Sequence, residues 1–423
     1  MKIVALNGLL GYGYSEEALE TAFSEKVDYL GSGKSFTDRG AVKRDLSLAL
    51  PKALEHKAPF IIGTAGGAGS SEHVAWLKDI ILEIAKEKNL KFTLGTVLSD
   101  VSTEYVLDKF DNGKIIDMSS EFPFDRKNAE ESSCIVSQIG IAPIIELLNK
   151  KVDVILCGRA CDTAIYAAPC IFEGYNHGLA FHMAKIMECG AMCSEPVAAA
   201  DVMQAYMYDD YFELRPANPA RRCTVDRVAA HTLYEQSNPY LIFEPDGVCD
   251  LTESEFVQAD ERTVRVFKSK FKEAEEKTLK LEGVRCVGYR TICPATIYDP
   301  ETIRNIDFII NTVMDFVKEN TKNTLPEDSY TVTFKTSGGP ESSMGVVMDI
   351  VGKTQEIADT VCALVRSRML HCDYQGRKST AGNLAFPFSP SDIHVGAVYE
   401  FSVFHLAKVD SLLETSEISV EEV

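Results

Sequence analysis

The chain has 423 residues, of which 45% are hydrophobic and 25% are charged, as is usual for a globular protein. This length exceeds what one hydrophobic core usually supports and favours two compact units. The formal net charge of −20 argues against nucleic acid or an anionic membrane surface as a partner, and no apolar run approaches the roughly 20 residues that cross a bilayer.

The first 200 residues alternate apolar runs with segments of helical periodicity, which predicts an α/β domain with a largely parallel sheet and crossover helices. We expect strands at 3–6, 29–30, 60–62, 92–97 and 152–157, and helices at 16–23, 42–54, 72–88 and 139–149.

A glycine-rich turn, Gly63-Thr-Ala-Gly-Gly-Ala-Gly69, joins the third expected strand to the longest helix. Glycine lets backbone N–H groups approach a ligand closely, and a helix N-terminus favours an anion. The candidate substrate-binding residues here are Thr64, Gly66, Gly67 and Ser70. A tight crossover turn without a ligand is the alternative. The turn has neither the Gly-Lys-Ser/Thr of a P-loop nor the glycine spacing of a dinucleotide site, so we expect neither ATP nor NAD.

A second turn, Cys157-Gly-Arg-Ala-Cys-Asp-Thr163, follows a buried strand and brings polar side chains to the sheet edge where ligands of open α/β folds collect. Arg159 can hold a carboxylate with both arms of its guanidinium. Asp162 can orient Arg159, bind a cation, or act as a general base if burial raises its pKa. Gly158 and Thr163 are further candidate substrate contacts. The alternative is an internal Arg159–Asp162 pair that only holds the turn together.

A helical segment further along places His182, Lys185 and Glu188 near one face by their i, i+3 spacing. Glu188 is a second candidate for acid–base catalysis. The alternative is a carboxylate at a helix end that is merely solvated or paired.

Twelve cysteines occur in a chain with no evident export signal, which predicts reduced thiols and a cytoplasmic location. The pairs Cys157/Cys161 and Cys189/Cys193 lack the close spacing of structural zinc sites. The sequence therefore assigns no metal ligands, although a divalent ion is compatible with the expected chemistry.

The pattern changes after residue 200. Residues 201–283 have short apolar stretches broken by prolines and are expected to form a mixed, partly antiparallel segment. Residues 284–423 are expected to form a second α/β domain of mixed α+β character, with an acidic tail after Leu413 that frays. Its expected elements are strands at 284–289 and 330–335 and helices at 303–319 and 353–370.

Several stretches together resemble the acyclic terpene utilisation family, the AtuA proteins, over most of the chain. They are Thr64-Ala-Gly-Gly, Val154-Ile-Leu-Cys-Gly-Arg-Ala-Cys-Asp-Thr-Ala, Met187-Glu-Cys-Gly-Ala and Pro245-Asp-Gly-Val-Cys-Asp-Leu. The resemblance implies a role in degrading branched terpenoid acids through CoA thioesters.

The resemblance also implies a partner, because short members of the family look like the large subunit beside a small companion that longer relatives carry fused at the C-terminus. This chain stops at Val423 without that extension, so we expect a separate small subunit and an oligomer. Where relatives have a glycine-rich segment, this chain has Pro216-Ala-Asn-Pro-Ala-Arg-Arg-Cys. Arg221 and Arg222 are therefore expected to supply positive charge to a substrate acid.

We therefore expect a lyase, a hydratase or dehydratase acting on a small branched carboxylic acid or its acyl-CoA ester. In this scheme Arg159 and the amides of Gly66 and Gly67 hold the substrate oxygens, and Asp162 or Glu188 moves the proton. The alternatives are a non-catalytic subunit that binds acyl-CoA or a partner protein, and an acyl or carboxyl transferase.

Overall fold

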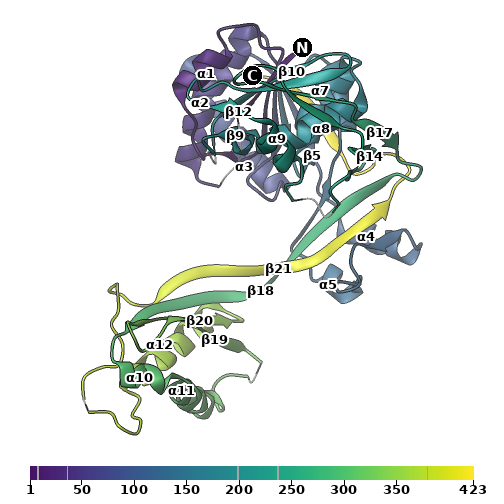
Figure 1. Cartoon of the computed structure of the whole chain (residues 1–423). Coiled ribbons are helices and arrows are strands. Elements are labelled where there is room, and N and C mark those ends of the chain that lie inside the picture. Colours follow the sequence, from purple (N-terminus) through teal and green to yellow (C-terminus); the bar gives the residue numbers. More distant parts are fainter. Residues whose placement is uncertain (7–8, 36, 198–199, 236–237, 327, 379) are drawn as a thin grey trace. The chain divides into compact units, whose positions relative to one another are not determined.

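The computed structural model describes residues 1–6, 9–35, 37–197, 200–235, 238–326, 328–378 and 380–423. The chain divides into two compact units, of which unit 1 is Met1–Gly283 with Ser402–Val423 and unit 2 is Val284–Phe401 (Figure 1). It leaves unit 1 within strand β18 (Thr278–Ile297) and returns within β21 (Ile393–Lys408). Residues 201–283 thus belong with the N-terminal α/β part, and so do residues 402–423.

The centre of unit 1 is a parallel sheet, as the sequence predicted. Neighbouring strands run in the order β1, β3, β4, β8, β5, and all of these pairs are parallel. Their residues are nearly all buried, as is typical of parallel strands covered on both faces. The bounds are β1 (Lys2–Leu6), β3 (Tyr29–Ser35), β4 (Phe60–Thr64), β8 (Val154–Cys157) and β5 (Thr93–Leu98), with the short β2 (Leu9–Leu10) beside the end of β3.

Helices cover both faces of this sheet. Alternate side chains of a strand enter opposite cores: Ile61 packs with one set of helices, and Phe60 and Ile62 pack with the other. Figure 1 shows the two sets on either side of the strands. One set is α1 (Glu16–Ala22), α2 (Arg39–His56) and α3 (Ser71–Lys88), and the other is α6 (Ala142–Asn149), α7 (Ala164–Phe172) and α8 (His177–Met187).

Antiparallel strands extend both edges of the parallel centre. Beside β1 lie β10 (Val202–Met207), β11 (Tyr211–Pro216), β16 (Val264–Phe267) and β15 (Glu255–Gln258). On the other edge, β22 (Glu417–Glu422) pairs with β5. The expectation that the tail frays was therefore wrong. The tail is ordered because its backbone completes the ladder of β5, and its acidic side chains are tolerated on an exposed edge strand.

The remaining elements of unit 1 surround the sheet. Two small sheets are formed by β9 with β12 and by β13, β14 and β17. The bounds are α4 (Thr103–Asp111), β6 (Ile115–Asp117), α5 (Arg126–Glu130), β7 (Cys134–Gln138), the 3₁₀ helix η1 (Gly190–Cys193), β9 (Ser194–Glu195), β12 (Arg222–Cys223), α9 (Val225–Thr232), β13 (Leu241–Glu244), β14 (Gly247–Asp250) and β17 (Lys270–Glu273).

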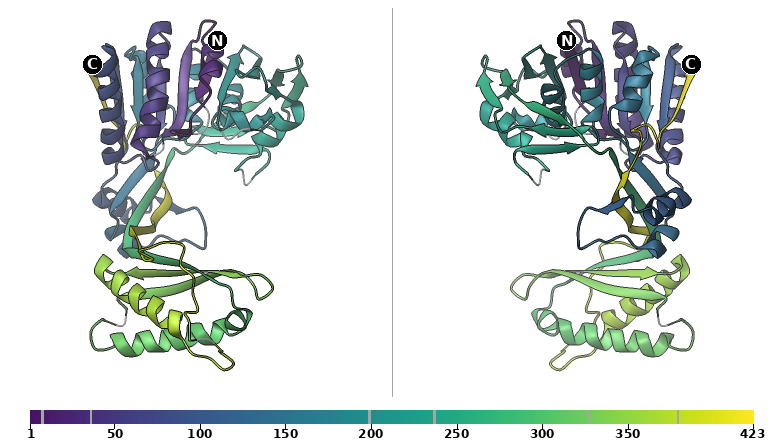
Figure 2. Two further views of the ribbon diagram at one scale, coloured as in Figure 1. Left: turned by 90° about the vertical axis from the view of Figure 1, so that its left-hand side faces the viewer. Right: turned by 90° about the vertical axis from the view of Figure 1, so that its right-hand side faces the viewer.

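Unit 2 has the mixed α+β character that the sequence predicted. Antiparallel strands β19 (Tyr330–Gly338), β20 (Met344–Gly352) and β18 lie side by side, with β21 next to β18. Figure 2 shows two helices against one face of this sheet. The helices of the unit are α10 (Pro300–Arg304), α11 (Ile306–Thr321) and α12 (Gln355–His371). Over the described residues of both units, every helix is too short or too polar to cross a bilayer.

Candidate functional site

The two glycine-rich turns lie against each other at the carboxyl edge of the parallel sheet, because β4 and β8 are neighbours. Gly69 has φ +70°, and a Cβ there would lie 2.3 Å from the backbone nitrogen of Arg159. A Cβ on Gly158 would lie 2.8 Å from the carbonyl oxygen of Gly69 and from Ser99 Oγ. Glycine at both positions therefore permits backbone-to-backbone packing between the turns.

A comparison of alanine variants at Gly69 and Gly67 separates the effect of this packing on stability from the effect of backbone conformation. Gly69→Ala is expected to destabilise the fold by about 2–4 kcal/mol, because the methyl group adds a clash to an unfavourable φ. Gly67→Ala shares the positive φ, at +79°, but the space around its Cβ is open. It should cost only about 1 kcal/mol. Urea unfolding of both variants measures the difference, and equal costs would contradict the close packing.

Arg159 is committed to protein partners. Its Nε lies 2.6 Å from Glu282 Oε2, and its Nη1 donates to Thr64 Oγ1 at 3.1 Å. Burial opposes the charge of Arg159, but the hydrogen bond and charge of Glu282 outweigh it and raise the pKa of the guanidinium. Asp162, for which orienting Arg159 was one of three roles considered, pairs with Lys34 at 3.0 Å. The alternative of an internal Arg159–Asp162 pair was therefore wrong, and the guanidinium holds the turn through Glu282 and Thr64.

The other candidates of the first turn also have protein partners. The amide of Gly66 donates to Ser35 Oγ at 2.6 Å, and Ser70 Oγ accepts from the amide of His73 at 3.4 Å as the N-cap of α3. These contacts favour the alternative of a structural crossover turn for Gly66 and Ser70.

Acidic side chains gather beside the second turn, and we call Asp162, Glu188 and Glu244 the carboxylate cluster. Glu188 is buried at the end of α8, and its Oε1 lies 2.5 Å from Lys185 Nζ. Thr163 Oγ1 donates to Glu244 Oε2 at 2.8 Å. The charge of Asp162 acts on Glu188, and the charge of Glu188 acts on Glu244. The structure thus brings Asp162, Thr163 and Glu188 together, as the sequence suggested.

Burial gives two of these carboxyls unusual proton affinities. Burial raises the pKa of Glu188 to about 7; Lys185 opposes this shift, whereas the charge of Asp162 adds to it. Burial likewise raises the pKa of Glu244 to about 8, with the charge of Glu188 adding to the effect. Asp162 differs from these two carboxyls in its hydrogen bonding, because its Oδ1 is buried without a hydrogen-bond partner among the described residues. The cluster therefore holds two carboxyls that can exchange a proton near neutral pH and one unused acceptor.

The raised pKa of Glu244 predicts a pH-dependent stability. The folded chain holds a proton on Glu244 more tightly than the unfolded chain, whose carboxyl titrates near 4.5. The stabilisation is thus complete below about pH 4.5 and is lost as the pH rises through about 8. Glu244→Gln should come within about 1 kcal/mol of the wild type near pH 5 and exceed its unfolding free energy by about 4 kcal/mol near pH 9. Urea unfolding at both pH values tests this, and an equal difference at both would contradict it.

Aromatic and histidine side chains of α9 and the following turn border Lys185. Lys185 Nζ lies 6.0 Å from the centre of the Tyr234 ring, and His231 stacks on Tyr234. Burial lowers the pKa of His231 to about 4, and the charge of Lys185 adds to this, so His231 is neutral at physiological pH. Lys185 is the cation that pairs with Glu188, and its charge also acts on Glu244.

A metal site does not emerge from the described residues, because no group of three His, Cys, Asp or Glu side chains has a metal-binding arrangement there. All 12 cysteines are free thiols. Burial raises the pKa of Cys189, next to Glu188, to about 11, which makes this thiol a weak nucleophile at neutral pH.

Arg221 and Arg222 lie elsewhere in unit 1. Arg221 Nε lies 2.7 Å from Asp201, and Arg222 Nη2 lies 3.4 Å from Glu195. Both line a cavity of about 780 Å³ that the carboxylate cluster does not line. The sequence therefore grouped two separate places into one expected site.

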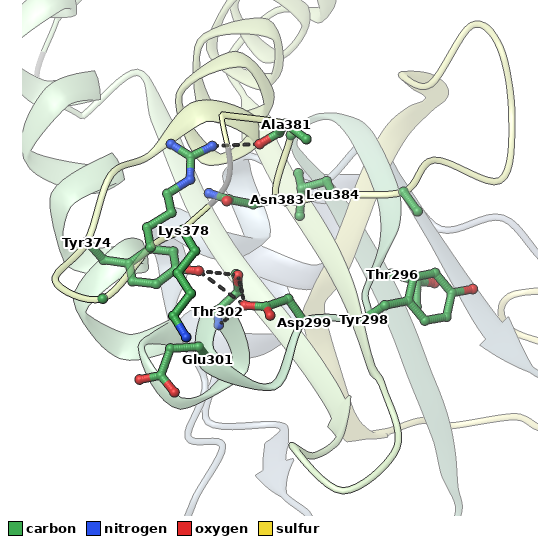
Figure 3. A pocket seen from close by; sticks show the side chains of 14 residues that line it. Thr296, Tyr298, Asp299, Glu301, Thr302, Tyr374, Lys378, Ala381, Asn383 and Leu384 are labelled. Carbon is green, nitrogen blue, oxygen red and sulfur yellow. Dashed lines mark hydrogen bonds between the residues drawn. The ribbon is translucent and has the colours of Figure 1, made fainter.

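Unit 2 has a cavity of its own, of about 580 Å³ (Figure 3). Asp299 Oδ2 accepts hydrogen bonds from the Thr302 amide at 2.7 Å and from the Tyr374 hydroxyl at 3.2 Å. Arg377 donates to the carbonyl of Ala381 at 2.7 Å. These contacts fix the start of α10 and the loop after α12, so Asp299, Thr302 and Tyr374, which Figure 3 shows joined by hydrogen bonds, serve the fold of the unit.

The model of the acyclic terpene utilisation family protein AtuA matches residues 34–207 and 215–392. The chain belongs to this family. No curated protein and no solved structure matches it. The match to the AtuA family spans both units and includes both glycine-rich turns, the carboxylate cluster and the two arginines at Arg221 and Arg222.

Sequence reasoning missed Glu244, Glu282 and Lys34 in this AtuA-family chain. Glu244 lies 81 residues after its partner Thr163, and Glu282 lies 123 residues after Arg159. One indication was available for Glu244, since it directly precedes the Pro245-Asp-Gly-Val-Cys-Asp-Leu stretch that carried the family resemblance.

Proposed function

We propose that the chain is a hydro-lyase, a hydratase or dehydratase for a small branched carboxylic acid or its acyl-CoA ester. The observation that carries the proposal is the buried Glu188, held by Lys185 beside Asp162, whose pKa of about 7 suits reversible proton transfer at neutral pH. Membership of the AtuA family supports the choice of a branched acid as the substrate class.

In the dehydration direction, ionised Glu188 takes the proton from the carbon next to the carbonyl, and the bond electrons form an enolate. Lys185 stabilises the negative charge that develops. The enolate then expels hydroxide from the neighbouring carbon, and protonated Glu244, with its pKa of about 8, gives this hydroxide a proton so that water leaves. Hydration follows the same steps in reverse.

Arg159 has a positioning role in this scheme, because Glu282 and Thr64 occupy its guanidinium. It fixes the turn that carries Asp162 and Thr163. The same proposal makes this chain the large subunit of an oligomer that includes a separate small companion. Activity is therefore measured with and without that companion.

The test is water addition. The full chain, alone and with a co-expressed small companion, is incubated in H₂¹⁸O with branched unsaturated acids and with their CoA esters, and mass spectrometry follows the label. The proposal expects ¹⁸O-labelled hydroxy product from one class. CoA-ester exchange without label would favour an acyl transferase, and binding without conversion by either preparation would favour a non-catalytic subunit.

A further inference from the structure

Three arginines surround one cavity in a chain of strongly acidic composition. The arginine cavity, of about 780 Å³, is lined by Arg221, Arg222 and Arg262 together with Thr224 and Gln258, and by the carboxylates Glu195 and Glu261. Its cations thus outnumber its anions, although the chain as a whole has a net charge of −20.

Arg262 gives the cavity a fixed wall. Its Nε donates to the carbonyl of Arg221 at 2.9 Å, and its Nη2 donates to the carbonyls of Pro216 and Asn218 at 2.9 and 2.7 Å. These bonds hold the loop that delivers Arg221 and Arg222. Burial lowers the pKa of Arg262, the charge of Arg215 adds to this shift, and the charge of Asp260 opposes it.

Arg222 is available to a ligand. Its side chain is 59% exposed, and its carboxylate partner Glu195 lies 3.4 Å away and is shared with Arg227 at 3.6 Å. Exposed pairs of this kind contribute little free energy. A phosphate carries more charge than a carboxylate and accepts two parallel hydrogen bonds from a guanidinium, so it can displace Glu195.

Helix α9 connects the arginine cavity to the carboxylate cluster. Thr224, its N-cap, lines the cavity. At its other end, His231 and Tyr234 border Lys185. Eight helical residues span about 12 Å, so the two places are about one short helix apart. A small free acid held at Glu188 is too short to reach the arginines, whereas an extended ester is long enough.

We propose that the arginine cavity binds the phosphate groups at the nucleotide end of an acyl-CoA, while the acyl end lies at the carboxylate cluster. This inference rests on the proposed function and narrows it, because it selects the CoA thioester over the free acid.

Calorimetric titration of the full chain tests the inference with coenzyme A, adenosine 3′,5′-bisphosphate, ADP, inorganic phosphate and a free branched acid as probes. Arg222→Gln should weaken the binding of coenzyme A and of the bisphosphate about tenfold, which is the effect of one lost charged hydrogen bond. Arg304→Gln is the matched control, since Arg304 is also 59% exposed and paired with a carboxylate. It should leave both affinities unchanged.

Arg222-dependent binding of coenzyme A and the bisphosphate, tighter than that of ADP and phosphate, supports the proposal. Failure of the phosphate compounds to bind, equal binding of inorganic phosphate, or indifference to Arg222→Gln would overturn it. The proposed function fails separately: Arg222-dependent coenzyme A binding without water addition keeps the phosphate site and removes the hydro-lyase. If free acids are hydrated at the same rate by the wild type and by Arg222→Gln, the hydro-lyase is kept and the phosphate site is removed.

Discussion

Glu188→Gln is expected to reduce turnover about 10³-fold, within the range that a positioned acid or base usually contributes. Glutamine keeps an oxygen that accepts from Lys185, but it cannot take a proton. The change leaves buried Lys185 without its ionic partner, so urea unfolding of the variant accompanies the kinetics and separates a loss of fold from a loss of chemistry. Steady-state kinetics with the best substrate of the labelling screen measure the loss.

The control is Glu253→Gln, which removes an exposed carboxylate paired with Lys270 and should leave turnover unchanged. Wild-type kcat should rise as the pH passes about 7, where Glu188 ionises, and fall above about 8, where Glu244 loses its proton. Full activity of Glu188→Gln, or a flat profile across this range, would remove Glu188 from the chemistry.

Arg159→Ala is expected to lower the unfolding free energy by about 3–4 kcal/mol, the range found when one partner of a buried ion pair is removed. Arg159 and Glu282 are only 12% and 14% exposed, and the loss of the guanidinium also removes the hydrogen bond to Thr64. Urea unfolding measures the change.

Two further variants separate charge pairing from general disruption. Arg159→Ala combined with Glu282→Gln should cost less than the sum of the two single changes, because Arg159 and Glu282 pair directly, although Glu282 also pairs with Lys280 at 2.6 Å. Arg304→Ala, at an exposed pair, should cost at most about 1 kcal/mol. Equal costs for Arg159→Ala and Arg304→Ala would show that Arg159 does not hold the turn.

The parallel centre of unit 1 was predictable because its strands contain short apolar runs that alternate with amphipathic helices, and two of the strands end in glycine-rich turns. β4 and β8, with every residue buried, show this pattern most clearly. The strand β22 was not predictable, because three of the six residues of Glu417–Glu422 are acidic and the segment is ordered by pairing with β5. The return of residues 402–423 to unit 1 was not predictable for the same reason, since pairing between distant segments leaves little trace in local composition.

The candidate site was predictable in its location more than in its contacts. Parallel strands end at one edge, which is why the two glycine-rich turns were expected to form one site, and Thr64 of one turn contacts Arg159 of the other. The partners of Arg159 and Asp162 were missed, because proximity in sequence suggested that they pair with each other. The fold instead supplies Glu282 from the start of β18 and Lys34 from β3, and buried charges take the partner that tertiary packing provides.

Exchange of the proton next to the substrate carbonyl with D₂O, followed by NMR, tests the role of Glu188 most directly because it isolates the first proton transfer from the loss of water. We expect the wild type and Glu244→Gln to exchange this proton, whereas Glu188→Gln does not. Glu244→Gln should still fail to release water. Exchange at the wild-type rate in Glu188→Gln would contradict the account.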